Sequence, residues 1–279
     1  MHTENTTYIY DVGENDKRRL QILNDAYNPT SRRVLLHHGI KACTCILDMA
    51  CGQGELTSWM AQQVAPDGIV VGVDLNDEQL SLAKERAHAH KISNVFFIKK
   101  DIFDLTPDDI YAVTGRRPDF IYCRWLLIHL EKQKIIQAMR TLYDVLAEGG
   151  RILHEEVALQ ESVAEKKSKA FETYVDIFLQ LAERLNIDFN FGSLLSEKME
   201  MLGYRHIQAV VSAPEWSLEQ MSFFPLDLQS AVPVLEKFAI SNKEKIDLLC
   251  KQLHHDQNHG ILMTMVNHLV FGTKKVHPE

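Results

Sequence analysis

The residues whose types and spacing are best suited to chemistry lie between Ile46 and Thr57, where the chain reads ILDMACGQGELT. Three apolar residues and Asp48 indicate a buried strand that ends in an acidic side chain. Ala50 to Gly54 would form a tight loop of small residues, and a helix is expected directly after it. A strand, a glycine loop and a helix in this order let the backbone approach a ligand closely at a helix N-terminus.

A second acid stands where a nucleoside site requires one. The next apolar run, GIVVGVD, ends at Asp74, and this residue lies 20 positions after Gly54. Nucleotide-binding folds place the acid that binds the ribose hydroxyls at about that distance. Loop and acid together are a far more specific signal than a lone G-x-G.

The loop is a poor match for a pyrophosphate. A dinucleotide site would carry G-x-G-x-x-G, and Thr57 stands where the third glycine belongs. Asp48 would also direct a negative charge toward the loop, which suits a cationic ligand such as an ammonium or a sulfonium. An NAD-dependent oxidoreductase is the enzymatic alternative, and the absence of a Tyr-x-x-x-Lys pair after the fourth expected strand disfavours it further.

The elements that must position these residues alternate along the chain, which predicts a parallel sheet with helices on both faces. The expected strands are Cys45–Met49, Ile69–Asp74, Val95–Lys100, Phe120–Cys123 and Ile152–Glu155, followed later by Arg205–Ser212 and Met263–Thr273. The expected helices are Glu55–Val64, Asn76–His90, Glu131–Leu146 and Leu194–Leu202. At the start of the chain, residues 16–36 are predicted to be helical with an interruption near Pro29.

The pattern L-D-x-A-C-G-x-G, residues 47–54, resembles the first motif of class I S-adenosylmethionine-dependent methyltransferases. The resemblance covers residues 45–156 well, and residues 190–212 and 262–274 in topology only. It implies an α/β, Rossmann-like, doubly wound sheet that is mostly parallel, with an antiparallel last strand. It also implies S-adenosyl-L-methionine as the cofactor.

Seen against that family, the chain carries two additional stretches that would form a helical lid. We expect an N-terminal helical cap (1–40), a cofactor-binding core (41–156), a helical insertion (157–190), a continuation of the core (191–213), a second helical insertion (214–261), and a last core strand with a tail (262–279). The insertions are rich in aromatic residues, and both begin near the carboxyl edge of the sheet, where ligands bind in open α/β folds. Packing among the inserted helices is the simpler explanation of any one aromatic residue.

The resemblance also implies roles for individual residues at the glycine loop and the second strand. Asp48 and the backbone around Ala50, Gly52 and Gly54 would hold the methionine portion of the cofactor. Asp74 would accept hydrogen bonds from both ribose hydroxyls, because the two oxygens of a carboxylate match a vicinal diol.

The resemblance implies further cofactor contacts at the ends of the second, third and fourth strands and near the N-terminus. Leu75 would lie against the adenine, and Asp101 with the backbone of Ile102 would bind its edge. Cys123 and Arg124 would line the sulfur, and Arg124 could equally form an ordinary salt bridge. Tyr10 and Arg19 would close over the cofactor, with the arginine paired to its carboxylate; this part of the match is partial, because Leu23 stands where a glutamine is expected.

Methyl transfer from a sulfonium is an in-line displacement that sometimes needs a base. His129 and His154 are the candidates of choice because the unperturbed pKa of histidine lies near neutrality, and Glu155 and Glu156 stand beside them. Each histidine could equally be a structural residue. No metal site is expected, since the late histidines lack an accompanying set of acids.

The composition and the absence of certain motifs narrow the class of methyl acceptor and the cellular compartment that we expect. The net charge of −8 over 279 residues argues against a nucleic-acid substrate, and no Asn/Asp-Pro-Pro-aromatic motif follows the fourth strand. We therefore predict a small organic acceptor, methylated on oxygen or nitrogen; a non-catalytic, cofactor-binding regulatory protein is the alternative. The lack of a long apolar run or signal peptide and the odd number of cysteines favour a cytoplasmic protein that does not enter membranes.

Overall fold

The computed structural model describes residues 14–276, with side chains from residue 17 onward. Its helices are α1 (Glu14–His37), α2 (Glu55–Val64), α3 (Asp77–Ala89), α4 (Pro107–Thr114), α5 (Ile135–Val145), α6 (Lys169–Leu185), α7 (Leu195–Met201), α8 (Phe223–Lys237) and α9 (Lys243–Asn258). Its strands are β1 (Cys45–Met49), β2 (Ile69–Asp74), β3 (Val95–Lys99), β4 (Phe120–Arg124), β5 (Arg151–Val157), β6 (Val163–Ala164), β7 (Arg205–Ser212), β8 (Met263–Thr264) and β9 (Asn267–Thr273).

Seven of the strands form one sheet in the order β3-β2-β1-β4-β5-β9-β7. The pairs among β1 to β5 are parallel, whereas β9 runs antiparallel to both β5 and β7. This confirms the predicted Rossmann-like sheet with its antiparallel last strand. Because the chain order reverses between β1 and β4, a crevice for a ligand is expected at the carboxyl ends of these two strands.

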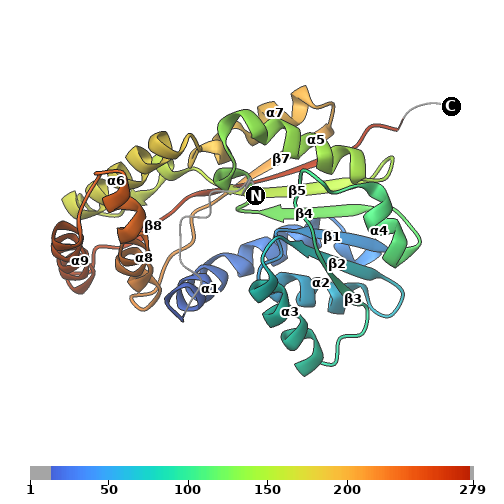
Figure 1. The fold of residues 1–279 in the computed structure, drawn as a ribbon, viewed down its shortest axis with the longest axis horizontal. Helices are drawn as coiled ribbons and strands as arrows, with labels where there is room; N and C mark the ends of the chain where they lie inside the picture. Colours follow the sequence, from blue (N-terminus) through green and yellow to red (C-terminus); the bar gives the residue numbers. More distant parts are fainter. Residues whose placement is uncertain (1–13, 277–279) are drawn as a thin grey trace.

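Helices cover both faces of the sheet (Figure 1). On one face, the end of α1 and helix α2 enclose a core with Ile46, Val70 and Phe120. On the other, α4, α5 and α7 pack over Leu47 and Ile121. Alternate residues of β1 therefore point to opposite cores, and the strand is buried along its whole length.

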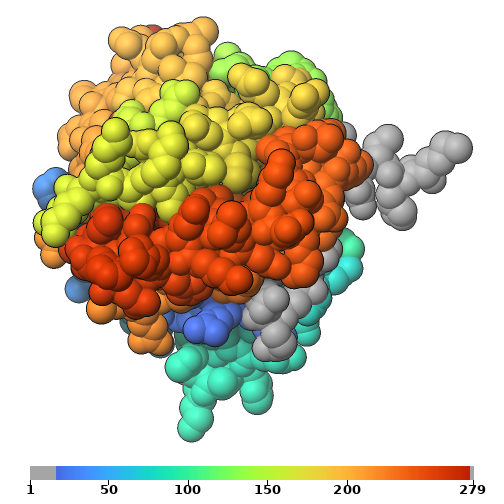
Figure 2. All heavy atoms as spheres, turned by 90° about the vertical axis from the view of Figure 1, so that its left-hand side faces the viewer, coloured from blue at the N-terminus to red at the C-terminus, as the bar shows by residue number. Residues whose placement is uncertain are grey.

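A cap of helices lies beyond the carboxyl ends of the central strands. It consists of α6, α8 and α9, which stand at one end of the sheet in Figure 1, together with the N-terminal part of α1. From outside (Figure 2), α6 and α9 lie side by side and close this end of the molecule. Aromatic rings fill the interior of the cap: Phe171, Tyr174 and Phe224 meet edge-on or stacked, with ring centroids 5.2–5.9 Å apart.

Two helices differ from the sequence prediction, and the predicted strand Met263–Thr273 is divided into β8, which pairs with β6, and β9. The first is α1, which continues through Pro29 without the predicted interruption. Pro29 and Asp25, one turn before it, are both exposed, so the carbonyl that a proline deprives of its partner faces solvent. The second is α4, which was not predicted. Its signal is the capping box at Thr106, with Pro107 in the first turn.

None of the helices in the described part of the chain combines the length and the apolar character needed to cross a membrane.

Candidate active site

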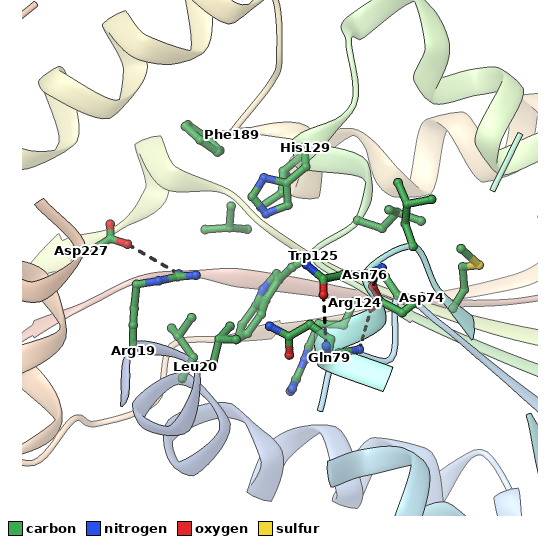
Figure 3. A pocket seen from close by; sticks show the side chains of 18 of the residues that line it. Arg19, Leu20, Asp74, Asn76, Gln79, Arg124, Trp125, His129, Phe189 and Asp227 are labelled. Carbon is green, nitrogen blue, oxygen red and sulfur yellow. Dashed lines mark hydrogen bonds and ion pairs between the residues drawn. The ribbon is translucent and has the colours of Figure 1, made fainter. Parts of the chain in front are cut away.

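A cavity of about 400 Å³ lies between the cap and the carboxyl ends of the central strands. Most of the residues predicted for the site line it: Arg19, Ala50, Gly52, Asp74, Leu75, Asp101, Ile102, Arg124 and His129. Figure 3 shows Asp74, Asn76 and Gln79 on one side of this cavity and Phe189 and Asp227 on the other. The structure thus brings together residues that lie more than two hundred positions apart in the sequence, such as Arg19 and Asp227.

Some predicted residues do not line the cavity. Asp48, Gly54, Cys123 and His154 are buried and are not among its lining residues. Tyr10 lies outside the described residues.

The glycine loop needs backbone conformations that L-residues rarely adopt. Ala50, Gly52 and Gly54 all have positive φ angles, of 61°, 51° and 68°. A Cβ at Gly52 would meet no atom within 4 Å, so this glycine leaves open space at the cavity wall. A Cβ at Gly54 would lie 2.7 Å from the Cβ of Ala83, so the second glycine serves the close packing of the loop on α3.

Asp74 ties the glycine loop to the second strand. Its Oδ2 accepts a hydrogen bond from the backbone N–H of Gly52 (2.9 Å), and its Oδ1 accepts one from Asn76 (2.9 Å). Burial raises the pKa of the Asp74 carboxyl, and the backbone N–H groups that it accepts from oppose this shift. Each oxygen keeps a second lone pair for a ligand, as binding a diol requires.

Asp48 lies under the loop rather than on the cavity surface. Its Oδ2 accepts a 2.5 Å hydrogen bond from the hydroxyl of Thr57, and burial raises its pKa to about 7. Thr57, which interrupts the dinucleotide pattern, is therefore the partner of this carboxyl. Both side chains are almost fully buried, and their bond links the end of β1 to the first turn of α2.

The part of the cavity around Leu75 and Asp101 is suited to a flat ring. Leu75 is apolar yet 40% exposed, so part of its surface is free for a ring to cover. Asp101 faces the same cavity, and its Oδ1 accepts a hydrogen bond from the N–H of Phe103 (3.0 Å), which orders the turn after β3. Ile102, between them, is buried.

Arg124 is held by helix α1. Its guanidinium donates to the side-chain oxygens of Asn24 (2.7 Å) and Asn28 (2.9 Å) and lies 4.4 Å from the ring centroid of Trp125. Trp125 has a φ of 52°. Such a positive φ is uncommon for a bulky residue, and strained backbone of this kind is found most often at functional sites. This network joins α1 to the end of β4.

The two glutamates considered as bases are bonded within the protein. Glu156 is fully buried, and its Oε1 accepts from the backbone N–H groups of Leu126 (3.0 Å) and Leu127 (2.9 Å). Burial raises its pKa to about 8. Glu155 accepts from Ser31, Tyr122 and Asn267. The hydrogen bonds of both carboxyl groups therefore stabilise the segments that surround the cavity.

His129 and His154 differ sharply in their surroundings. His129 ends a short 3-10 helix (Leu127–His129) that Glu156 anchors, and it lines the cavity. Burial, together with the charge of Arg19, lowers its pKa to about 4. The ring is therefore neutral near pH 7 and could accept a proton.

His154 lies inside β5, fully buried, and away from the cavity. Neither ring nitrogen has a hydrogen-bond partner among the described residues, and burial lowers its pKa to about 3. The proposal of His154 as a base is corrected on this ground, because a ring enclosed in the sheet cannot reach a bound acceptor.

This burial makes His154 a source of acid sensitivity. Below pH 6.5 the unfolded chain takes up a proton that the folded ring refuses, so stability is lost as the pH falls from 6.5 toward 3. Replacing His154 with Leu should remove a difference of about 2.5 kcal/mol in unfolding free energy between pH 7 and pH 4.5. Urea unfolding at both pH values measures it. His88→Leu, at an exposed position of α3, is the control; an equal loss in wild type and His154→Leu would contradict the assignment.

One polar cluster on the cavity was not predicted. Asp227 of α8 pairs with Arg19 of α1 at 3.6 Å and accepts a 2.8 Å hydrogen bond from the hydroxyl of Tyr174 in α6. All three residues are buried and line the cavity. The only sequence signal for Asp227 is an acid placed within the apolar face of a helix, FFPLDLQSAV.

Comparison with known proteins identifies the family. A family model described as "Methyltransferase domain" matches residues 40–201, more than half of the chain. The chain belongs to this family. The resemblance to class I S-adenosylmethionine-dependent methyltransferases is thereby confirmed.

A curated relative matches part of the chain. The ubiquinone/menaquinone biosynthesis C-methyltransferase UbiE of Marinomonas sp. (strain MWYL1) is 29% identical over 163 residues, which cover 56% of this chain and 61% of that relative. The chain thus spans less than two thirds of that relative's length.

Solved structures of methyltransferases share the fold. A SAM-dependent methyltransferase from Aquifex aeolicus superposes with a TM-score of 0.53 at 17% identity, covering 74% of this chain and 93% of that one. An N-methyltransferase from Haemonchus contortus, solved with phosphomonomethylethanolamine and S-adenosylhomocysteine, gives a TM-score of 0.50 at 17% identity, covering 93% and 52%. At these identities the likeness concerns the fold alone.

Proposed function

We propose that this protein is an S-adenosylmethionine-dependent methyltransferase that methylates a small organic molecule. The observation that carries the proposal is the arrangement of Asp74, Gly52 and Leu75 at one end of the cavity. A carboxylate with free lone pairs, a backbone without a side chain and an uncovered apolar surface follow one another there, as the ribose, the methionine portion and the adenine of the cofactor require. Family membership supports the same ligand.

The other cofactor contacts that we propose follow from this placement. Asp101 and the backbone of Ile102 would bind the adenine edge, and Ala50 would line the methionine portion. Asp48 would act through the loop, because its carboxyl lies beneath it and bonds to Thr57. The ion pair with Asp227 supports a place for Arg19 on the acceptor side of the cavity rather than on the cofactor carboxylate.

In the reaction, the cofactor supplies an electrophilic methyl group on a positively charged sulfur. The cavity walls align the acceptor with it, and the cap keeps water away during the displacement. An acceptor that carries a proton must lose it, and His129 is the neutral base on the cavity wall.

Calorimetry with S-adenosylhomocysteine and with NAD, each titrated into the same protein, tests the cofactor. We expect micromolar binding of S-adenosylhomocysteine and none of NAD; the reverse would overturn the proposal. Transfer of a radiolabelled methyl group from S-adenosylmethionine, screened over a metabolite extract, tests the activity. Cofactor binding without transfer to any fraction would favour the regulatory protein instead.

We also propose a cytoplasmic location. All five cysteines are free, which fits a reducing compartment. The acidic net charge supports a small-molecule acceptor over nucleic acid.

A further inference from the structure

The cavity has two chemically different halves. Figure 3 shows the polar side chains of Asp74, Asn76 and Gln79 at one end and Phe189 with Asp227 at the opposite end. Apolar and aromatic side chains that contact Asp227, Phe189 or one another surround this opposite end. This second half, which we call the acceptor half, is lined by Val157, Tyr174, Phe178, Phe189, Phe223 and Met265. A ligand there would be in contact mainly with apolar side chains.

The charged side chains of the acceptor half cancel. Among the described lining residues of this half they are Arg19 and Asp227, which pair at 3.6 Å with side chains only 5% and 3% exposed. The two charges of the pair neutralise each other, so neither of these described side chains offers an uncompensated counter-ion to an acceptor with a full charge. Burial of an unpaired charge is costly, whereas a neutral molecule incurs no such penalty.

His129 is the polar group that stands between the two halves. In Figure 3 its ring lies between Phe189, on the acceptor side, and Trp125. Its position is fixed, because Glu156 holds the backbone of the same short helix with two hydrogen bonds. Its ring is neutral, since burial and the Arg19 charge disfavour the protonated form. A hydroxyl group facing His129 can therefore donate a hydrogen bond to the ring, which takes up the proton as bond formation to the methyl carbon makes the oxygen strongly acidic.

From these observations we propose that the acceptor is an uncharged, largely apolar molecule with a ring-sized body and one hydroxyl group, which lies in the acceptor half with its hydroxyl facing His129. This rests on the proposed methyltransferase function and specifies its substrate class. The hydroxyl oxygen forms a bond to the methyl carbon while the bond from that carbon to sulfur breaks. The electron pair of the broken bond stays on sulfur, the hydroxyl proton passes to a ring nitrogen of His129 and then to solvent, and the products are a methyl ether and S-adenosylhomocysteine.

Three single-ring probes of matched shape test the charge preference: 4-ethylphenol, 4-ethylbenzylamine, which is cationic near pH 7, and 4-ethylbenzoate, which is anionic. Each is titrated calorimetrically into the protein saturated with S-adenosylhomocysteine. We expect 4-ethylphenol to bind at least tenfold more tightly than either charged probe. Tighter or equal binding of a charged probe, or no binding of any probe at millimolar concentration, would overturn the proposal.

Failure of this inference is distinct from failure of the proposed function. If S-adenosylhomocysteine itself does not bind, the methyltransferase assignment is wrong. If it binds and a charged probe is preferred, only the substrate class is wrong.

Substitutions at Phe189 test the location of the probe. Phe189→Ala should weaken 4-ethylphenol at least tenfold and leave the affinity for S-adenosylhomocysteine within twofold. Phe189→Leu keeps most of the apolar volume and guards against a folding defect; its loss should be intermediate. Tyr111→Ala, at an exposed aromatic residue of α4, is the control and should change neither affinity. Unchanged phenol binding in both Phe189 variants would place the acceptor elsewhere.

The pH profile of single-turnover methylation of 4-ethylphenol tests His129. With the wild type, the rate should be nearly constant from pH 6 to pH 9, because the ring is already neutral. With His129→Gln, the rate at pH 7 should fall about 100-fold and then rise with pH toward about 10, where a phenol ionises by itself. A residue that only supports the fold would lower the rate without changing this profile, so an unchanged profile would remove His129 from the reaction.

Discussion

Replacing Asp74 with Ala should weaken the binding of S-adenosylhomocysteine about 100-fold. The carboxylate is expected to accept hydrogen bonds from two ribose hydroxyls, and bonds to a charged group contribute about 1.5–3 kcal/mol each. The same oxygens accept from the N–H groups of Gly52 and Asn76, so the substitution also loosens the loop on which the methionine portion would rest. Isothermal titration calorimetry near pH 7 measures the affinity.

Two further variants make the result specific to the ribose contact. Asp104→Ala changes an exposed acid of the neighbouring turn and should leave the affinity unchanged. Adenine should bind the Asp74→Ala variant about as well as the wild type, because it has no ribose. If Asp74→Ala is folded and binds S-adenosylhomocysteine normally, the cofactor site proposed here is wrong.

The central strands could be predicted because they are buried along most of their length. In β1 and β2 the apolar run begins and stops where the structure has the strand, and the flanking glycines and acids mark the limits. The start of α3 could also be predicted, because Asn76 is a residue type that caps helices, and its side chain does cap this one. The sequence alone could not show that α1 continues past Pro29, because that depends on which side of the helix faces solvent.

The site was harder to predict where it depends on long-range packing. The residues that follow strand ends, such as Asp74 and Asp101, were predicted to lie together, since parallel strands place their carboxyl ends at one edge. Asp227 could not be foreseen, because it reaches Arg19 only when α8 packs on α1. His154 was misleading for a related reason: β5 is buried on both faces, so no alternation of polar residues shows which face meets the cavity.

Replacement of the two loop glycines, Gly52 and Gly54, with Ala should have opposite effects: one should lower mainly the ligand affinity and the other mainly the stability. At Gly54, the added Cβ would lie 2.7 Å from the Cβ and 3.2 Å from the Cα of Ala83 in α3, and backbone cannot yield as a flexible side chain would. Overpacking and the positive φ together should cost about 3 kcal/mol of unfolding free energy, or roughly 5–10 °C in Tm. At Gly52, where a Cβ meets nothing within 4 Å, only the backbone strain of about 1 kcal/mol applies.

The consequence for the ligand is the reverse, because the methyl group at Gly52 would occupy the space against which the cofactor is expected to rest. Gly52→Ala should therefore lower the affinity for S-adenosylhomocysteine at least tenfold while the protein stays folded. Thermal unfolding of both variants and calorimetry on Gly52→Ala separate the two effects. A large loss of stability in Gly52→Ala would mean that the first glycine is needed for packing of the loop. An unaltered Tm in Gly54→Ala would mean that the second glycine is not.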